Sequence, residues 1–141
     1  MASVTDPEVH KFLTEGTRTG KLAYTNAAGR VLVAPIWYIV EDGDLIFNTG
    51  ADTVKGKFLV RERQATICVD LEQPPYLFVQ VQGNAELSND PEELLRTATA
   101  IAARYVGPDR ADQFGQRNAA PGELVIRLRP TKVLAAFDMI A

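Results

Sequence analysis

The chain has 141 residues, of which 46% are hydrophobic, and it carries a formal net charge of −3 at pH 7. This length predicts a single domain spanning residues 1–141, with enough apolar side chains to fill a core. The small acidic excess excludes a basic surface that binds a nucleic-acid backbone, and no apolar run approaches the roughly 20 residues that cross a bilayer.

The first predicted element is a helix within residues 6–16, because Asp6 can cap it and Pro7 suits its first position. Alternating or β-branched residues between short polar turns then indicate three strands, at 21–25, 31–40 and 45–47. Because their connections are short, these strands form an antiparallel meander. Pro35 cannot donate a ladder hydrogen bond, so it belongs at a sheet edge or at a bulge.

The rest of the chain combines strands with longer helices. A helix is predicted over about 52–63, and a strong start at Asp90 and Pro91 opens another that ends near Val106. The remaining elements are strands over 65–71, 76–87 and 122–137, and a short helix or turn over 109–118. Six strands with peripheral helices predict a mainly β (α+β) fold, a closed or partly closed antiparallel barrel.

Several enzyme classes lack the residues they need. His10 is the one histidine, so a serine or cysteine nucleophile would have no imidazole base, and we expect His10 to face solvent or to pack. Cys68 alternates with apolar strand residues, which favours an inert thiol. No Cys, His or carboxylate cluster has metal-ligand spacing, and neither G-x-G-x-x-G nor G-x-x-x-x-G-K-[ST] occurs.

Two features favour a cytoplasmic protein. The first six residues lack the basic start and apolar stretch of a signal peptide. A single cysteine cannot form an intrachain disulfide, which is typical of a reducing compartment.

The segment 47–59 carries most of the functional argument. A strand there ends in a polar turn and leads into a helix whose beginning contains Lys55 and Lys57. A helix N-terminus exposes unpaired N–H groups and a partial positive charge, which suit an anion. The two lysines sharpen this preference, and we interpret the segment as the anchor of a phosphate-bearing cofactor.

A structural interpretation of the same helix stays open at this point. On a helical wheel its apolar arc consists of Val54, Phe58 and Leu59, and Lys55 falls within that arc. A lysine there must reach solvent or find an anion, because burying an unpaired ammonium is costly. Glu62 also falls within the arc, so a Lys55–Glu62 ion pair or a plain solvated basic helix would explain the pattern as well.

Aromatic side chains occur near this anchor. Trp37 and Tyr38 lie just past Pro35, and Tyr76 and Phe78 share one face of a predicted strand. Such residues suit a flat ring system, although an ordinary barrel core would also use them.

Three segments together resemble the pyridoxamine-phosphate-oxidase-like split barrels, namely residues 34–38, 47–57 and 79–87. More narrowly, these segments and residues 102–105 and 121–133 are similar to the flavin/deazaflavin oxidoreductases of actinobacteria, the branch that uses coenzyme F420. The resemblance covers nearly the whole chain. It implies a six-stranded antiparallel split β-barrel and a homodimer with two cofactor sites along the subunit interface.

The resemblance also implies residue roles. Lys55 would bind the cofactor phosphate with help from Thr53 and Lys57, and the strand from Pro35 to Tyr38 would lie against the ring system. Tyr76 and Leu77 would approach from the partner subunit, and Gln80 and Gln82 are weaker candidates near the ring. The complete set of expected cofactor-binding residues is Pro35, Ile36, Trp37, Tyr38, Thr49, Thr53, Lys55, Lys57, Tyr76 and Leu77.

The sequence departs from true pyridoxamine phosphate oxidases, because residues 131–137 lack the Arg and His that hold the vitamin phosphate. We therefore expect an oxidoreductase that uses reduced F420 to deliver a hydride to a small conjugated acceptor. The alternatives are an FMN-binding oxidoreductase or electron carrier, a non-catalytic flavin-, deazaflavin- or haem-binding protein, and a barrel without a cofactor. Lys57, Arg61 and Arg63 could form the basic groove that the polyglutamate tail of F420 requires. No side chain stands out as a general acid.

Overall fold

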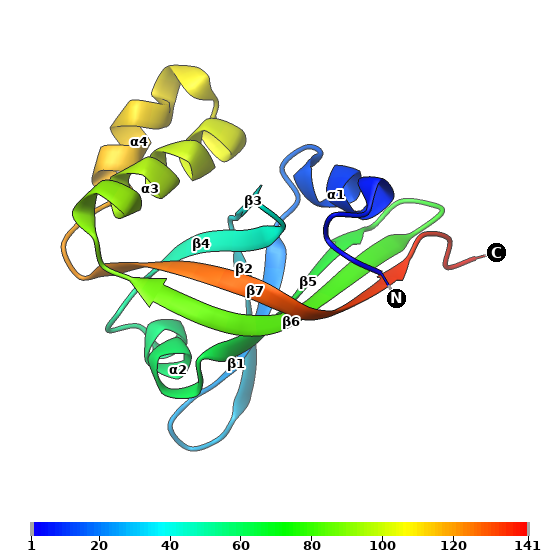
Figure 1. The fold of residues 1–141 in the computed structure, drawn as a ribbon, viewed down its shortest axis with the longest axis horizontal. Helices are drawn as coiled ribbons and strands as arrows, with labels where there is room; N and C mark the ends of the chain where they lie inside the picture. Colours follow the sequence, from blue (N-terminus) through cyan, green and yellow to red (C-terminus); the bar gives the residue numbers. More distant parts are fainter. Residues whose placement is uncertain (1, 141) are drawn as a thin grey trace.

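The computed structural model describes residues 2–140. Its strands are β1 (Gly20–Thr25), β2 (Val31–Ile36), β3 (Ile39–Glu41), β4 (Asp44–Gly50), β5 (Gln64–Leu71), β6 (Leu77–Ser88) and β7 (Glu123–Ala136). Its helices are α1 (Pro7–Thr14), α2 (Val54–Glu62), α3 (Pro91–Val106) and α4 (Ala111–Asn118), with a short 3₁₀ turn at Pro108–Arg110. In Figure 1, α3 and α4 lie together, and α2 lies on the opposite side of the long strands β6 and β7.

The strands form one antiparallel sheet in the order β2-β1-β5-β6-β7-β4-β3. This order puts β2 and β3 at opposite edges, yet only Trp37 and Tyr38 separate them in the chain. Three Cα–Cα steps span at most about 11 Å, so the two edges must come close together. The sheet therefore curls into a barrel, as Figure 1 shows, and the predicted split β-barrel is confirmed.

The number of strands differs from the predicted six. Residues 31–40 form two strands because the chain leaves one edge of the sheet at Ile36 and enters the other at Ile39. Pro35 lies on edge strand β2 and pairs with Lys21 of β1 without a register shift. Of the two predicted locations for Pro35, the sheet edge is therefore confirmed, and no bulge occurs there. Its missing N–H therefore falls where no ladder bond is needed.

Helix starts follow the sequence signals in most cases. Pro7 and Pro91 occupy the first turns of α1 and α3, and the Asp90 carboxylate accepts a hydrogen bond from the Glu93 amide at 3.1 Å. Asp6 occupies the expected N-cap position of α1, but its carboxylate accepts from the Ser3 amide at 2.8 Å and not from an amide of the helix.

The core lies inside the curl of the sheet. Alternate residues of β5 and β6 point into it, and α1 covers it with one apolar face. The buried side chains on these elements are Ile67, Val69, Val79, Val81, Val9, Phe12 and Leu13. Gln80 and Gln82 point to the other face of β6, where their side chains hydrogen-bond each other at 2.9 Å.

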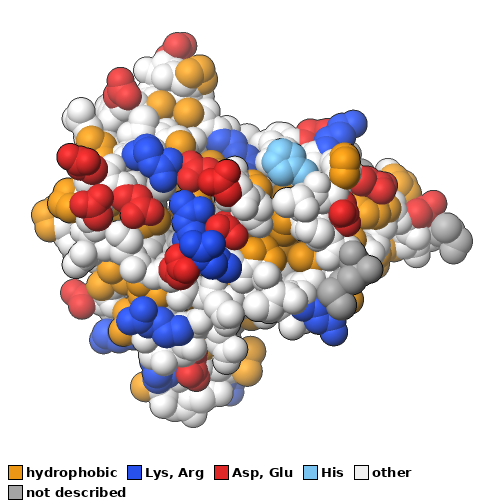
Figure 2. Space-filling model, viewed as in Figure 1, with side chains coloured by type: hydrophobic (Ala, Val, Ile, Leu, Met, Phe, Trp, Pro, Cys, Tyr) orange, Lys and Arg blue, Asp and Glu red, His pale blue; other side chains and the backbone are white. Residues whose placement is uncertain are grey.

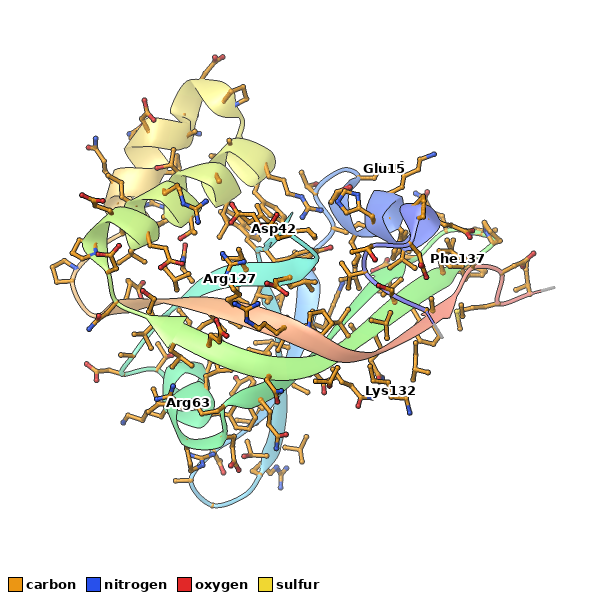
Figure 3. All side chains as sticks on the ribbon, in the orientation of Figure 1. Glu15, Asp42, Arg63, Arg127, Lys132 and Phe137 are labelled. Atoms are coloured by element: carbon orange, nitrogen blue, oxygen red, sulfur yellow. The ribbon has the colours of Figure 1, made fainter. Side chains whose placement is uncertain are left out.

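An ion-pair network fixes α3 on the sheet. Arg127 of β7 pairs with Glu41 at 3.4 Å and with Asp44 at 3.3 Å, and Arg96 of α3 binds Glu41 at 2.6 Å. Figure 2 shows red and blue side chains alternating across the middle of this face, and Figure 3 shows Arg127 among them. The hydrogen bond from Arg96 holds the pKa of Glu41 below its usual value. No helix within residues 2–140 is long and apolar enough to cross a membrane.

Candidate functional site

Helix α2 begins against the end of strand β4 because two residues there allow close contact. A Cβ on Gly56 would lie 2.0 Å from the carbonyl oxygen of Gly50, so only glycine permits this approach. Thr53 caps the helix: its Oγ1 accepts from the Gly56 amide at 3.0 Å and donates to the Gly50 carbonyl at 2.7 Å. Thr49 Oγ1 lies 3.3 Å from the same hydroxyl. The Thr53 hydroxyl therefore already donates one hydrogen bond and accepts another within the cap.

The first turn of α2 retains unpaired hydrogen-bond donors. Within residues 2–140, the backbone amides of Val54 and Lys55 have no hydrogen-bond partner, as the first amides of a helix lack one inside it. In the same range Lys55 forms no ion pair, so the Lys55–Glu62 pair considered above does not occur. Val54 is 47% exposed and does not belong to the buried arc, which Gly56 helps to form. Two amides and one ammonium thus remain available to an anion.

These donors lie beside a surface cavity of about 400 Å³. Six of the ten expected cofactor-binding residues line it together, namely Pro35, Ile36, Trp37, Thr49, Thr53 and Lys55. Sequence reasoning missed the other lining residues, which are Asn48, Gly50, Ile101, Asn118 and Glu123. The cavity therefore joins the cap of α2 to the aromatic end of β2.

Trp37 forms a fixed aromatic wall of this cavity. Its ring stacks on Tyr105 of α3 with a centroid distance of 5.0 Å and an angle of 2° between the planes. Tyr105 is itself held, because its hydroxyl donates to the Arg18 carbonyl at 2.8 Å and accepts from the Tyr38 amide at 3.3 Å. Trp37 stays 40% exposed, so part of the ring is free to meet a flat ligand.

Tyr38 lies in the core, away from the cavity. Its side chain is fully buried and its hydroxyl donates to the Leu13 carbonyl at 2.6 Å. Burial raises the pKa of Tyr38 to about 12, against the opposing influence of Arg104. Arg104 also donates to the Tyr38 carbonyl at 2.7 Å, which ties α3 to the link between β2 and β3. The Tyr38 side chain therefore packs in the core and does not line the cavity.

Lys57, Tyr76 and Leu77 also lie outside the cavity. Lys57 lines a separate surface groove with Arg61 and the turn at 25–28, because residues two apart on a helix point in different directions. Tyr76 is exposed in the turn before β6, and Leu77 lines a hollow beside α1. That these two reach a cofactor from a partner subunit stays a prediction.

Glu123 is the most informative residue that sequence reasoning missed. It begins β7 and pairs across the sheet with Gly50 at the end of β4. Its Oε2 is buried and has no hydrogen-bond partner within residues 2–140. This oxygen lies 3.1 Å from where a Cβ on Gly50 would be, and the Thr53 methyl lies at the same distance. The cavity therefore contains one acidic and one basic side chain, both near the cap of α2.

Other chemistry is not supported by the geometry. Within residues 2–140 no three His, Cys, Asp or Glu side chains are placed to hold a metal ion. His10 is exposed on α1. Burial, with a smaller contribution from Asp70, raises the pKa of the Cys68 thiol, which agrees with the inert thiol expected from its strand position.

Fold and site together define a split β-barrel that presents a capped helix N-terminus, a lysine and an aromatic wall to one cavity. The sequence profile of the family described as Pyridoxamine 5'-phosphate oxidase matches residues 5–136, and the chain therefore belongs to this family. The family resemblance stated from the sequence is confirmed. A search of curated proteins found no match.

Solved structures with the same fold differ widely in sequence. A conserved hypothetical protein, Rv2991 from Mycobacterium tuberculosis, is 24% identical with a TM-score of 0.81, over 95% of this chain and 84% of that one. A structure described as an F420 reductase is 22% identical with a TM-score of 0.70, over 88% and 94%. The haem storage protein HutZ from Vibrio cholerae is 17% identical with a TM-score of 0.71, over 96% and 98%. At these identities the similarity shows the fold alone.

Proposed function

We propose that this protein is a cytoplasmic oxidoreductase that binds reduced coenzyme F420 and delivers a hydride to a small conjugated acceptor. The observation that carries the proposal is the meeting of Lys55, whose amide is free, with Trp37 in one cavity at the N-terminus of α2. Reduced F420, when bound, supplies the hydride. The chain's own residues bind the phosphate, orient the ring and exclude water from one of its faces.

The phosphate contacts follow from the geometry of α2. The Val54 and Lys55 amides and the Lys55 ammonium point to an anion held at the helix N-terminus. Thr53 acts indirectly, because its hydroxyl is occupied by the cap. Trp37, fixed by Tyr105, would then contact the ring system.

The groove beside α2 favours F420 over FMN. Lys57 and Arg61 line this groove together with Val54, whose amide is one of the two free donors. A chain of carboxylates that starts at the phosphate could therefore continue along basic side chains. FMN ends at its phosphate and would gain nothing from this groove. FMN is the second candidate, because it also carries a phosphate for α2 and a flat ring for Trp37.

We further propose a homodimer whose partner completes the site. Edge strand β2 exposes Val31 and Val33, which are 74% and 68% accessible. Neighbouring exposed apolar residues of this kind favour burial against another chain. Light scattering on the purified protein should give the mass of two chains, and Val33→Lys should shift it toward one.

The direct test is a spectroscopic titration with F420 and with FMN. Lys55→Ala should weaken both ligands by roughly tenfold to a hundredfold, because a charge-assisted contact is worth about 1.5–3 kcal/mol. Lys57→Ala should weaken F420 alone. Lys132→Ala is the matched control, since Lys132 is exposed on β7, far from α2 (Figure 3).

Four outcomes would redirect the proposal. Equal affinity of wild type and Lys55→Ala would remove the phosphate assignment. A protein that is yellow as purified would favour FMN. Binding without turnover of quinones, enones and tetrapyrroles would indicate a non-catalytic carrier, and no affinity for either ligand would indicate a barrel without a cofactor.

A further inference from the structure

Glu123 takes no part in the proposed phosphate and ring contacts, although its carboxylate lines the same cavity. A carboxylate beside a phosphate anchor repels the phosphate, and a buried carboxylate oxygen without a donor is itself unfavourable. Both costs meet at Oε2 of Glu123, which lies over the Gly50 backbone next to the cap of α2.

The charges of the cavity are nearly balanced. Its lining contains one cationic side chain, Lys55, and one anionic side chain, Glu123, while the other nine residues are uncharged. Within residues 2–140 neither of the two forms an ion pair, so both stay available to a ligand. The N-terminus of α2 adds a partial positive charge of about half a unit. Lys55, Glu123 and the helix N-terminus together give about +0.5 charge, which suits an anion of one negative charge better than an anion of two.

This difference separates two kinds of phosphate. A phosphodiester carries one negative charge at pH 7, whereas a phosphate monoester, with a second pKa near ~6, carries nearly two. FMN is a monoester and F420 is a phosphodiester.

We propose that Glu123 is a specificity-determining residue of this cavity, whose carboxylate selects a phosphodiester against a phosphate monoester. The assignment rests on the proposed phosphate site at α2 and deepens it. The mechanism is repulsion: Glu123 disfavours the additional charge of the monoester, because Lys55 and the helix N-terminus together supply only about 1.5 positive charges against Glu123 and the ligand.

The test compares two ligands that differ by one methyl group on the phosphate and hence by about one negative charge. They are FMN and its phosphate monomethyl ester, titrated against wild type and Glu123→Gln by flavin fluorescence. Wild type should bind the methyl ester more tightly than FMN. Glu123→Gln should reduce this preference by at least roughly tenfold, chiefly through tighter FMN binding, as expected for unit charges within about 12 Å of each other near a protein surface.

Two controls separate the possible failures. Glu92→Gln removes the same charge from an exposed position on α3 and should leave the preference unchanged. Thermal unfolding of Glu123→Gln without ligand should occur at or above the wild-type temperature, because the variant removes the charge from a carboxylate whose Oε2 is buried without a partner.

An equal change for both ligands would overturn the assignment, since it would mean that Glu123 only accepts a hydrogen bond. A wild type that prefers FMN would overturn it without any variant. If wild type binds neither flavin and also fails to bind F420, the proposed function falls and the assignment falls with it. If wild type binds but the preference survives in Glu123→Gln, only the assignment falls.

Discussion

Gly56→Ala gives a test in which two physical effects have opposite signs. In an ordinary helix interior this substitution stabilises by roughly 0.5–1 kcal/mol, because alanine loses less backbone entropy on folding. Here the new Cβ would lie 2.0 Å from the Gly50 oxygen, 3.0 Å from the Gly50 carbonyl carbon and 3.1 Å from the Ala51 carbonyl carbon. All three are backbone atoms and cannot rotate away, so α2 must move off the end of β4.

Overpacking of this kind costs typically about 1–3 kcal/mol, and contact with fixed backbone belongs at the upper end. After the helix gain is subtracted, we expect Gly56→Ala to lose about 2 kcal/mol, or about 4–10 °C in the unfolding midpoint measured by circular dichroism. Cofactor affinity should fall as well, because the Val54 and Lys55 amides move with the helix.

Lys57→Ala serves as the control on the exposed face of the same helix, and its stability should change by no more than about 0.5 kcal/mol. A Gly56→Ala protein that melts at or above the wild-type temperature would show that α2 does not contact β4 as described.

Three further predictions concern single side chains. Burial raises the folded-state pKa of Tyr38 to about 12. The stability that this shift contributes is therefore complete below pH 10 and is lost as pH rises through about 12. An alkaline absorbance titration should show one tyrosine ionising last, and Tyr38→Phe should remove that step. Cys68 should react with a thiol reagent much more slowly at pH 7 than after unfolding in urea, and equal rates would contradict its burial. Trp37 is the single tryptophan, so Tyr105→Leu should shift its emission to the red and increase quenching by acrylamide, whereas Tyr105→Phe, which keeps the ring, should not.

Local signals in the sequence were sufficient for much of the fold and for the helix start at the candidate anion site. Proline and acidic residues mark the starts of α1 and α3, and period-two alternation marks β5 and β6. The candidate anion site is also local, because the cap at Thr53 and the cation at Lys55 belong to one helix turn. The number of strands could not be predicted from local signals. Residues 31–40 are apolar throughout, so the pattern does not show that the chain crosses from one sheet edge to the other at Trp37 and Tyr38.

Residues that reach the site through tertiary structure could not be found in this way. Glu123 enters the cavity because β7 pairs with β4, a contact between positions more than seventy residues apart. Tyr105 reaches Trp37 because α3 packs beside the link between β2 and β3. Tyr38 follows Trp37 directly, and its side chain points into the core instead. Lys57 lines a different groove from Lys55, as the two-residue spacing on a helix already indicates, and its contact with a cofactor stays a prediction.

The central claim is that α2 holds a phosphate at a cavity that also receives a ring. A crystal structure of the protein soaked with F420 tests it most directly. We expect the phosphate within hydrogen-bonding distance of the Val54 and Lys55 amides and the ring against Trp37. A ligand bound elsewhere, with the first turn of α2 empty, would contradict it.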